Sequence, residues 1–222
     1  YGVKNLVSKL LLTLLPQSSS FFRLEIDELV LNKENPEQGF KAMIEDGLAK
    51  IERAAMKRIE SSGDRVAINE MLTHLIIGGN VLIFKPPSGG MRVFHLDRFV
   101  VKRDPMGNPL EIITHEEVSP SALPPDFLES LREDLKKDGS TSDERTINIY
   151  TYIKRTPERW EVFQECCGHK IPDTSGHYPL DELPWLALRA TRIDGEDYGR
   201  SYVEPNLGDL MSLEGLMQAI VE

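Results

Sequence analysis

The sequence predicts an α+β fold in which helices and strands are grouped along the chain and the sheets are mostly antiparallel. Three helical patterns come first, a run of short strand patterns follows, and a further helical pattern closes the sequence. Strands and helices do not alternate as parallel βαβ units require, and no repeat of about 20–50 residues is present. Hydrophobic residues make up 40% of the chain and charged residues 28%, a composition that supports a sizeable core.

Amphipathic patterns predict the first helices. Apolar residues at three- and four-residue spacing predict helices over residues 3–15, 40–60 and 66–77. The third helix is expected to be capped by Asp64 or its neighbour and to end at the Gly78-Gly79 pair. Between the first two helices, residues 21–27 alternate well enough to predict a short strand.

Seven further strand patterns follow, most of them bounded by turn residues. They lie at residues 81–84, 91–96, 99–103, 110–118, 146–154, 159–166 and 185–190. Proline and glycine at 86–90 predict a hairpin between the first two, and 104–108 is a turn by composition. A short charged helix is expected over 123–137, a polar loop over 138–143 and a Pro/Gly-rich loop over 168–184. After Asp194-Gly195 the chain is expected to become helical, with Pro205 near the first turn.

The charge balance bears on the partners of the protein. There are 36 acidic and 26 basic residues, which gives a formal net charge of −10. Proteins that grip DNA through its phosphates are basic on at least one face, so tight DNA binding is not expected. A surface past which DNA slides is another matter, because like charge lowers adhesion. The longest apolar run, residues 10–15, is far shorter than the roughly 20 residues that span a bilayer, so no membrane partner is expected.

Catalytic motifs are not found in the sequence. It has no phosphate-binding Walker loop, no Gly-x-Gly-x-x-Gly fingerprint and no Gly-x-Ser-x-Gly nucleophile elbow. We therefore predict no catalytic, cofactor-binding or metal-ligating residues, no cofactor and no enzymatic activity.

Two clusters have part of what a metal site needs. Cys166, Cys167, His169 and His177 could be imagined around zinc, but zinc thiolates are normally two to four residues apart. Neighbouring residues of a strand point to opposite faces, so we expect one buried and one exposed cysteine at a strand end, without a disulfide. The acidic cluster Asp194, Glu196 and Asp197 offers three carboxylates, and a metal-dependent nuclease or hydrolase using them is the alternative function. The favoured interpretation is a turn with acidic side chains at a helix N-terminus.

Other polar residues are given structural interpretations. His74 is expected in a helix and His95 and His115 in strands, each as a satisfied structural side chain. A small basic patch is favoured as a solvated face or an intersubunit ion pair over a nucleic-acid site, because few stacking aromatics accompany it. Its members are Arg98, Lys102 and Arg103. A third hypothesis is a generic adaptor domain that binds a partner helix through residues 3–15.

Five blocks of residues, in order along nearly the whole chain, resemble one protein family. The longest is Arg192-Ile193-Asp194-Gly195-Glu196-Asp197-Tyr198-Gly199-Arg200-Ser201-Tyr202, continued by Glu204, Leu207-Gly208-Asp209-Leu210, Ser212-Leu213-Glu214 and Ala219-Ile220-Val221. The others are Asn5-Leu6 with Ser8-Lys9-Leu10 and Leu14-Leu15-Pro16, then Gly79-Asn80-Val81-Leu82, then Val100-Val101 with Arg103-Asp104 and Gly107-Asn108, and Leu123-Pro124 with Asp126. The sequence is identified by them as a member of the portal, or head-to-tail connector, family of podovirus-type short-tailed phages.

The resemblance implies a structural subunit of a ring of about twelve copies at one capsid vertex, located in the virion at the head-tail junction after assembly in the host cytoplasm. It implies a channel for DNA packaging and ejection, used by double-stranded DNA without sequence specificity. The implied partners are further copies of the chain, the major capsid and scaffolding proteins, terminase, and tail adaptor and tail tube proteins. The family has no catalytic residues to carry over.

The resemblance also implies a domain assignment. Residues 1–200 look like the N-terminal part of a portal wing domain, and residues 201–222 look like the start of a helix leading to the stem. The chain begins at Tyr1 inside one amphipathic pattern and ends at Glu222 inside another, so we expect a segment of a longer protein. The clip, the remaining stem and the crown would then lie outside it.

Overall fold

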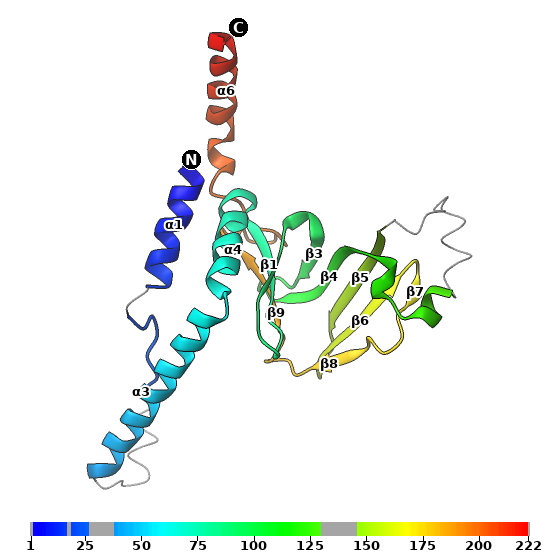
Figure 1. The fold of residues 1–222 in the computed structure, drawn as a ribbon. Coiled ribbons are helices and arrows are strands. Elements are labelled where there is room, and N and C mark those ends of the chain that lie inside the picture. Colours follow the sequence, from blue (N-terminus) through cyan, green and yellow to red (C-terminus); the bar gives the residue numbers. More distant parts are fainter. Residues whose placement is uncertain (1, 17–18, 27–37, 130–145, 222) are drawn as a thin grey trace.

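The computed structural model describes residues 2–16, 19–26, 38–129 and 146–221 and has the predicted α+β architecture (Figure 1). Its long helices are α1 (Gly2–Leu14), α3 (Gln38–Ser61), α4 (Asp64–Gly78) and α6 (Leu207–Val221). All four confirm helical patterns in the sequence. None of the helices in the described ranges is long and apolar enough to cross a membrane.

Helices α1 and α4 pack together beside the sheets, whereas α3 extends away from them (Figure 1). Val7 of α1 is buried against Leu72 and Ile76 of α4, with partly buried leucines around them. The apolar stripe of the first helix is therefore core, which contradicts the hypothesis that residues 3–15 bind a partner helix. No side chain in residues 40–61 is buried, and Met43 and Ile51 are exposed.

A small three-stranded antiparallel sheet has the order β2-β1-β9. Its strands are β1 (Asn80–Phe84), β2 (Arg92–Phe94) and β9 (Trp185–Arg189). The predicted hairpin pairs β1 with β2. Strand β9 returns from the other end of the sequence and pairs along the whole of β1, from Asn80 opposite Arg189 to Phe84 opposite Trp185.

The second sheet is antiparallel, with the order β3-β4-β5-β6-β7 and β8 also paired to β6. Its strands are β3 (Phe99–Arg103), β4 (Pro109–Val118), β5 (Ile147–Arg155), β6 (Trp160–Cys166), β7 (His169–Lys170) and β8 (Gly176–Tyr178). Short 3-10 turns precede β3 (Leu96–Arg98) and follow β4 (Pro120–Ala122). Ile147, Ile149 and Ile153 are all buried, so the predicted period-two burial of β5 is confirmed.

One apolar cluster joins the two sheets. Leu82 and Trp185 from the small sheet meet Ile112, Ile153 and Trp160 from the large one, and each is at least nine-tenths buried. A second cluster, around Cys166 and Ile171, covers the other end of the large sheet. The sheets therefore share a core, and the elements attached to them have a common frame.

Several sequence predictions are wrong in detail. Residues 21–26 are irregular instead of a strand, and Leu24 N donates a hydrogen bond to Glu52 Oε1 of α3 at 2.6 Å. The loop expected at 168–184 contains β7 and β8, and the helix expected directly after Asp194-Gly195 begins only at Glu204, with a 3-10 turn (Glu204–Asn206). Of the helix predicted over 123–137, residues 125–129 are helical and residues 123–124 are not. Residues 130–137, like the loop at 138–143, lie outside the described residues.

Of the two caps predicted for α4, Asp64 or its neighbour, the structure has the neighbour. The N-cap is Gly63, whose φ is +72° and which offers no side chain, and Asp64 is the first helical residue. Asp64 is 5% exposed, and its carboxylate lies 3.0 Å from the ammonium group of Lys85, which follows β1. Burial raises the pKa of Asp64, but its contacts with Lys85, Ser62 and Arg58 together outweigh burial and hold the pKa below 3.8.

Replacing Asp64 with asparagine is expected to lower the free energy of unfolding by about 1–2 kcal/mol at pH 7, because the buried charge pairs with a half-exposed lysine. A carboxyl whose pKa is lower in the folded state stabilises above its unfolded pKa, and this contribution is lost as pH falls through the folded value. The difference between wild type and Asp64→Asn should therefore shrink as the pH falls below about 3.9, the ordinary pKa of an unfolded aspartate. Urea unfolding of both proteins at pH 7 and pH 3 measures it, and a pH-independent difference would contradict the ion pair.

Candidate functional site

Residues 190–206, here called the junction, connect β9 to α6 and contact both sheets and α4. Thr191 and Arg200 form an isolated antiparallel bridge, with hydrogen bonds of 3.3 and 3.0 Å, so the residues between them form a closed loop. Ala190 N donates to Gly79 O at 2.8 Å, and Tyr202 N donates to Ile76 O at 3.2 Å. These bonds fix the junction against the C-terminal end of α4.

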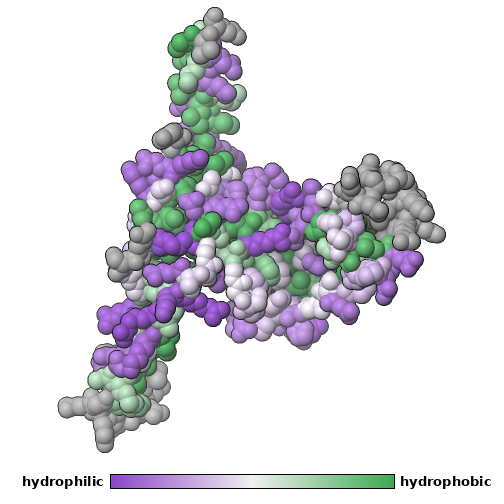
Figure 2. All heavy atoms as spheres, in the orientation of Figure 1, coloured by the Kyte–Doolittle hydropathy of each residue, from purple (hydrophilic) through white to green (hydrophobic). Residues whose placement is uncertain are grey.

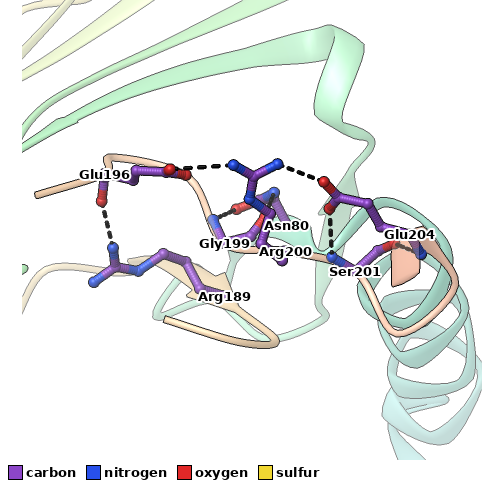
Figure 3. A network of polar contacts seen from close by, with 7 residues as sticks. All are labelled: Asn80, Arg189, Glu196, Gly199, Arg200, Ser201 and Glu204. Atoms are coloured by element: carbon purple, nitrogen blue, oxygen red, sulfur yellow. Dashed lines mark hydrogen bonds and ion pairs between the residues drawn. The ribbon is translucent and has the colours of Figure 1, made fainter. Parts of the chain in front are cut away.

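Asn80, the first residue of β1, holds the centre of the junction (Figure 3). Its side chain is 4% exposed and makes hydrogen bonds with both polar groups of Gly199. Nδ2 donates to Gly199 O at 2.8 Å and to Gly78 O at 3.1 Å, and Gly199 N donates to Oδ1 at 2.7 Å. A buried amide with all these bonds satisfied favours one arrangement of the chain over others.

A capping box begins the helical segment that leads into α6. Ser201 Oγ accepts a hydrogen bond from Glu204 N at 2.8 Å, and the Glu204 carboxylate accepts one from Ser201 N at 3.4 Å. Arg200 joins this carboxylate at 2.5 Å and that of Glu196 at 3.2 Å (Figure 3). The hydrogen bond from Arg200 lowers the pKa of Glu204, and the pKa of Arg200 is correspondingly raised.

The junction also covers the open edge of the large sheet. Strand β3 is the edge strand, and its outward N–H groups would otherwise lack protein partners. Val101 N donates to the Tyr198 hydroxyl at 3.1 Å, and Arg103 N donates to Asp197 Oδ1 at 2.7 Å. The Arg103 guanidinium donates to Asp197 O and to Ala187 O of β9, both at 2.9 Å. The junction therefore links the two sheets to each other.

Helix α6 leaves the junction and projects away from the rest of the protein (Figure 1). Every one of its residues 207–220 is exposed, although only two of them, Asp209 and Glu214, carry a charge. The exposed large apolar side chains are those of Leu207, Leu210, Met211, Leu213, Leu216, Met217 and Ile220. Figure 2 shows this hydrophobic surface along the projecting helix. A helix of such composition is normally covered by other protein.

Comparison with known proteins assigns this architecture to a family. The family model described as "Bacteriophage head to tail connecting protein" matches residues 1–222. The chain belongs to this family. Among curated proteins, the chain is 36% identical over 228 residues to the portal protein of Escherichia phage T7 and 37% identical over 227 residues to that of Enterobacteria phage T3. Each of these two alignments covers 100% of this chain. It is 30% identical to the portal protein of Enterobacteria phage SP6 over 99% of the chain. The chain spans 42% of the length of each of these relatives.

Three of the sequence blocks that resemble the connector family meet at the junction. The block around Asn80, the block from Val100 to Asn108 and the first part of the longest block, from Arg192 to Glu204, are far apart in sequence, yet the hydrogen bonds described above join them. The predicted family is confirmed, and the structure adds a physical role for these residues. They set where α6 begins and in which direction it leaves.

The acidic cluster is part of the junction. Asp197 accepts from Arg103 N, Glu196 pairs with Arg200, and Asp194 has neither interaction. The described residues contain no group of three or more His, Cys, Asp or Glu side chains placed to hold a metal ion. The favoured interpretation is half right: Asp194 and Gly195 form the predicted turn, but the acids do not lie at a helix N-terminus, because the helical segment begins only at Glu204.

The cysteines are arranged as predicted, one buried and one exposed. Cys166 is fully buried at the end of β6, and Cys167 is exposed in the turn that follows, with φ +53°. Both are free thiols, with sulfur atoms 3.8 Å apart. Burial is the main cause that raises the pKa of the Cys166 thiol to about 12, so this thiol is protonated at neutral pH.

The histidines and the basic patch are integrated into the fold. His74 lies in α4 and His115 in β4 as predicted, but His95 follows the end of β2 and its Nδ1 accepts from Asp97 N at 3.3 Å. The predicted basic patch is divided: Arg98 lies 3.3 Å from Glu117, whereas Arg103 is half-buried in the junction. Sequence reasoning missed the junction, although the local pattern Ser201-Tyr202-Val203-Glu204 is a signature of a capping box.

Proposed function

We propose that this chain is the wing region of a ring-forming portal subunit, with the wing domain at residues 1–200 and a stem-directed helix beginning at residues 201–222. In this proposal the protein is structural and not an enzyme. The observation that supports it most strongly is the bare apolar surface of α6. Seven large apolar side chains on one short helix need a cover that the described part of this chain does not provide.

A closed ring needs two different faces on each subunit, because every copy contacts one neighbour with one face and the other neighbour with the opposite face. Helix α6 offers such a pair. Leu210, Leu213, Met217 and Ile220 recur at three- and four-residue spacing on one side. Gly208, Ser212, Gly215 and Ala219 recur in the same way on the opposite side. Large side chains of one copy can pack against the small-residue side of the next.

The finer proposals follow from the family. The ring would have about twelve copies and form the channel for DNA packaging and ejection at the head-tail junction of the virion. Its partners would be the capsid and scaffolding proteins, terminase, tail adaptors and tail tube proteins. The net charge of −10 supports a conduit that does not retain double-stranded DNA.

The test is the assembly state of the full-length protein. Native mass spectrometry and negative-stain electron microscopy should show closed rings of about a dozen copies, the number that the family resemblance implies, at micromolar concentration. A full-length protein that stays monomeric over that concentration range would contradict the proposal.

A further inference from the structure

Three arginine side chains surround Gly107 in the turn between β3 and β4. Arg103 Nη1 donates to Gly107 O at 2.9 Å. A Cβ atom added to Gly107 would lie 2.6 Å from Arg189 Nη2 and 3.2 Å from Arg192 Cζ. Glycine, here with φ +89°, lets both guanidinium groups approach the turn closely at this point. Residues from β3, β9 and the junction thus bring three positive charges together.

None of these three guanidinium groups forms an ion pair with a carboxylate of the residues that the structure describes. The guanidinium group of Arg103 donates only to main-chain carbonyl groups, and Arg189 Nη1 donates to the main-chain oxygen of Glu196 at 2.8 Å. Arg192 Nη2 makes one long contact with Pro105 O, at 3.5 Å. Burial lowers the pKa of Arg103, and the positive charge of Arg189 lowers it further. The cluster therefore holds like charges that an anion would stabilise.

A cavity of about 270 Å³ opens beside the cluster. Its basic lining residues are Lys102, Arg103, Arg189 and Arg192. The acidic residues in its wall have partners of their own: Asp104 bonds to Asn108 at 2.8 and 2.9 Å, Glu196 pairs with Arg200, and Asp197 accepts from Arg103 N. Only Glu196 among them has a cation partner outside the cavity, because the bonds of Asp104 and Asp197 are to neutral N–H groups. The four basic lining residues thus outnumber the two remaining carboxylates, and the net charge facing the cavity is positive in a chain whose net charge is −10.

We propose that this cavity is a binding site for a single oxyanion, a phosphate ion or a carboxylate group. Guanidinium groups donate parallel N–H bonds that match the oxygen atoms of both groups. The acidic wall and the overall negative charge oppose a polyanion such as DNA but admit one small anionic group. The site is complete within one chain, so the proposal does not depend on ring formation.

Titration calorimetry with sodium phosphate and with sodium acetate, at constant ionic strength maintained with sodium chloride, tests the proposal. The wild-type chain should bind at least one of them saturably, with a Kd on the order of 1 mM. Arg192→Gln should weaken that binding about tenfold or more. This variant should fold, because Arg192 is exposed and makes one long hydrogen bond. Arg155→Gln, at the exposed end of β5, is the matched control and should bind as the wild type does.

Each outcome has a clear meaning. Binding of phosphate alone identifies a tetrahedral ion as the ligand, whereas binding of acetate identifies a carboxylate, such as an acidic side chain of another copy. Absence of saturable binding of both anions overturns the proposal, and so does an affinity that Arg192→Gln leaves unchanged. Tighter binding of a short DNA duplex than of phosphate, lost in Arg192→Gln, would overturn the selectivity for a single group.

Discussion

Replacing Gly79 with alanine is expected to lower the free energy of unfolding by about 3–5 kcal/mol, the range of severe single substitutions. Gly79 ends α4 with φ +70°, a conformation that costs an L-residue about 1–2 kcal/mol. A Cβ atom there would also lie 2.6 Å from main-chain atoms of both Arg200 and Ser201. Because those atoms belong to the backbone, no side-chain rotation relieves the clash, and the junction must move away from α4.

Gly63→Ala is the matched control for this substitution. Gly63 stands at the other end of α4 with φ +72°, and a Cβ atom there would meet nothing within 4 Å. Its substitution is expected to cost only about 1–2 kcal/mol, for the backbone conformation alone. Urea unfolding of both variants measures the difference. Equal losses would mean that the close contact of Gly79 with the junction contributes nothing to stability.

The second large effect is expected on assembly. Placing glutamates at Leu213 and Met217 together should reduce the ring fraction of the full-length protein by at least about tenfold, since it buries two charges in an apolar contact. The fold of the wing should be unaffected, because both side chains are exposed and exposed positions change stability by about 0.5 kcal/mol or less. Native mass spectrometry measures the ring fraction, and thermal unfolding of the 222-residue chain measures the fold.

Gln218→Glu provides the control for added negative charge on the same helix. Gln218 is also exposed, but it lies outside the side of the helix that is formed by Leu210, Leu213, Met217 and Ile220. This variant should form rings as the wild type does. If Leu213→Glu/Met217→Glu also forms rings normally, α6 is not the contact between copies, even if the full-length protein is a ring.

Local patterns in the sequence were sufficient to predict most elements. The alternation of apolar and polar residues predicted β5, proline and glycine predicted the β1–β2 hairpin, and the spacing of apolar residues predicted the helices. Each of these signals depends on neighbouring residues alone. Two-residue strands such as β7 carry too little pattern to be recognised. Of the strand expected at residues 21–27, residue 27 lies outside the described residues. Residues 21–26 are irregular because Leu24 bonds to Glu52 of α3, and no strand in the described part of the chain pairs with them.

The junction could not be predicted in the same way. Its central contact joins Asn80 to Gly199, 119 residues apart, and nothing in the local sequence specifies that pairing. Arg103 illustrates the same limit, since a run of basic residues suggests a solvated surface whereas the fold places this side chain between two sheets. The capping box at Ser201 was the one local signal available, and it marks only where the helical segment begins.

The position of the junction at the base of α6 has a mechanical consequence. A helix of 15 residues is about 22 Å long, so a rotation of only about 10° at its base displaces its tip by about 4 Å. That displacement is as large as a whole side-chain contact. The short polar bonds around Asn80 and Arg200 therefore fix the orientation of the helix at its base. The stiffness of these bonds limits how far the helix tip is displaced by a rotation at the base. In a closed ring, the displacements of successive copies would add.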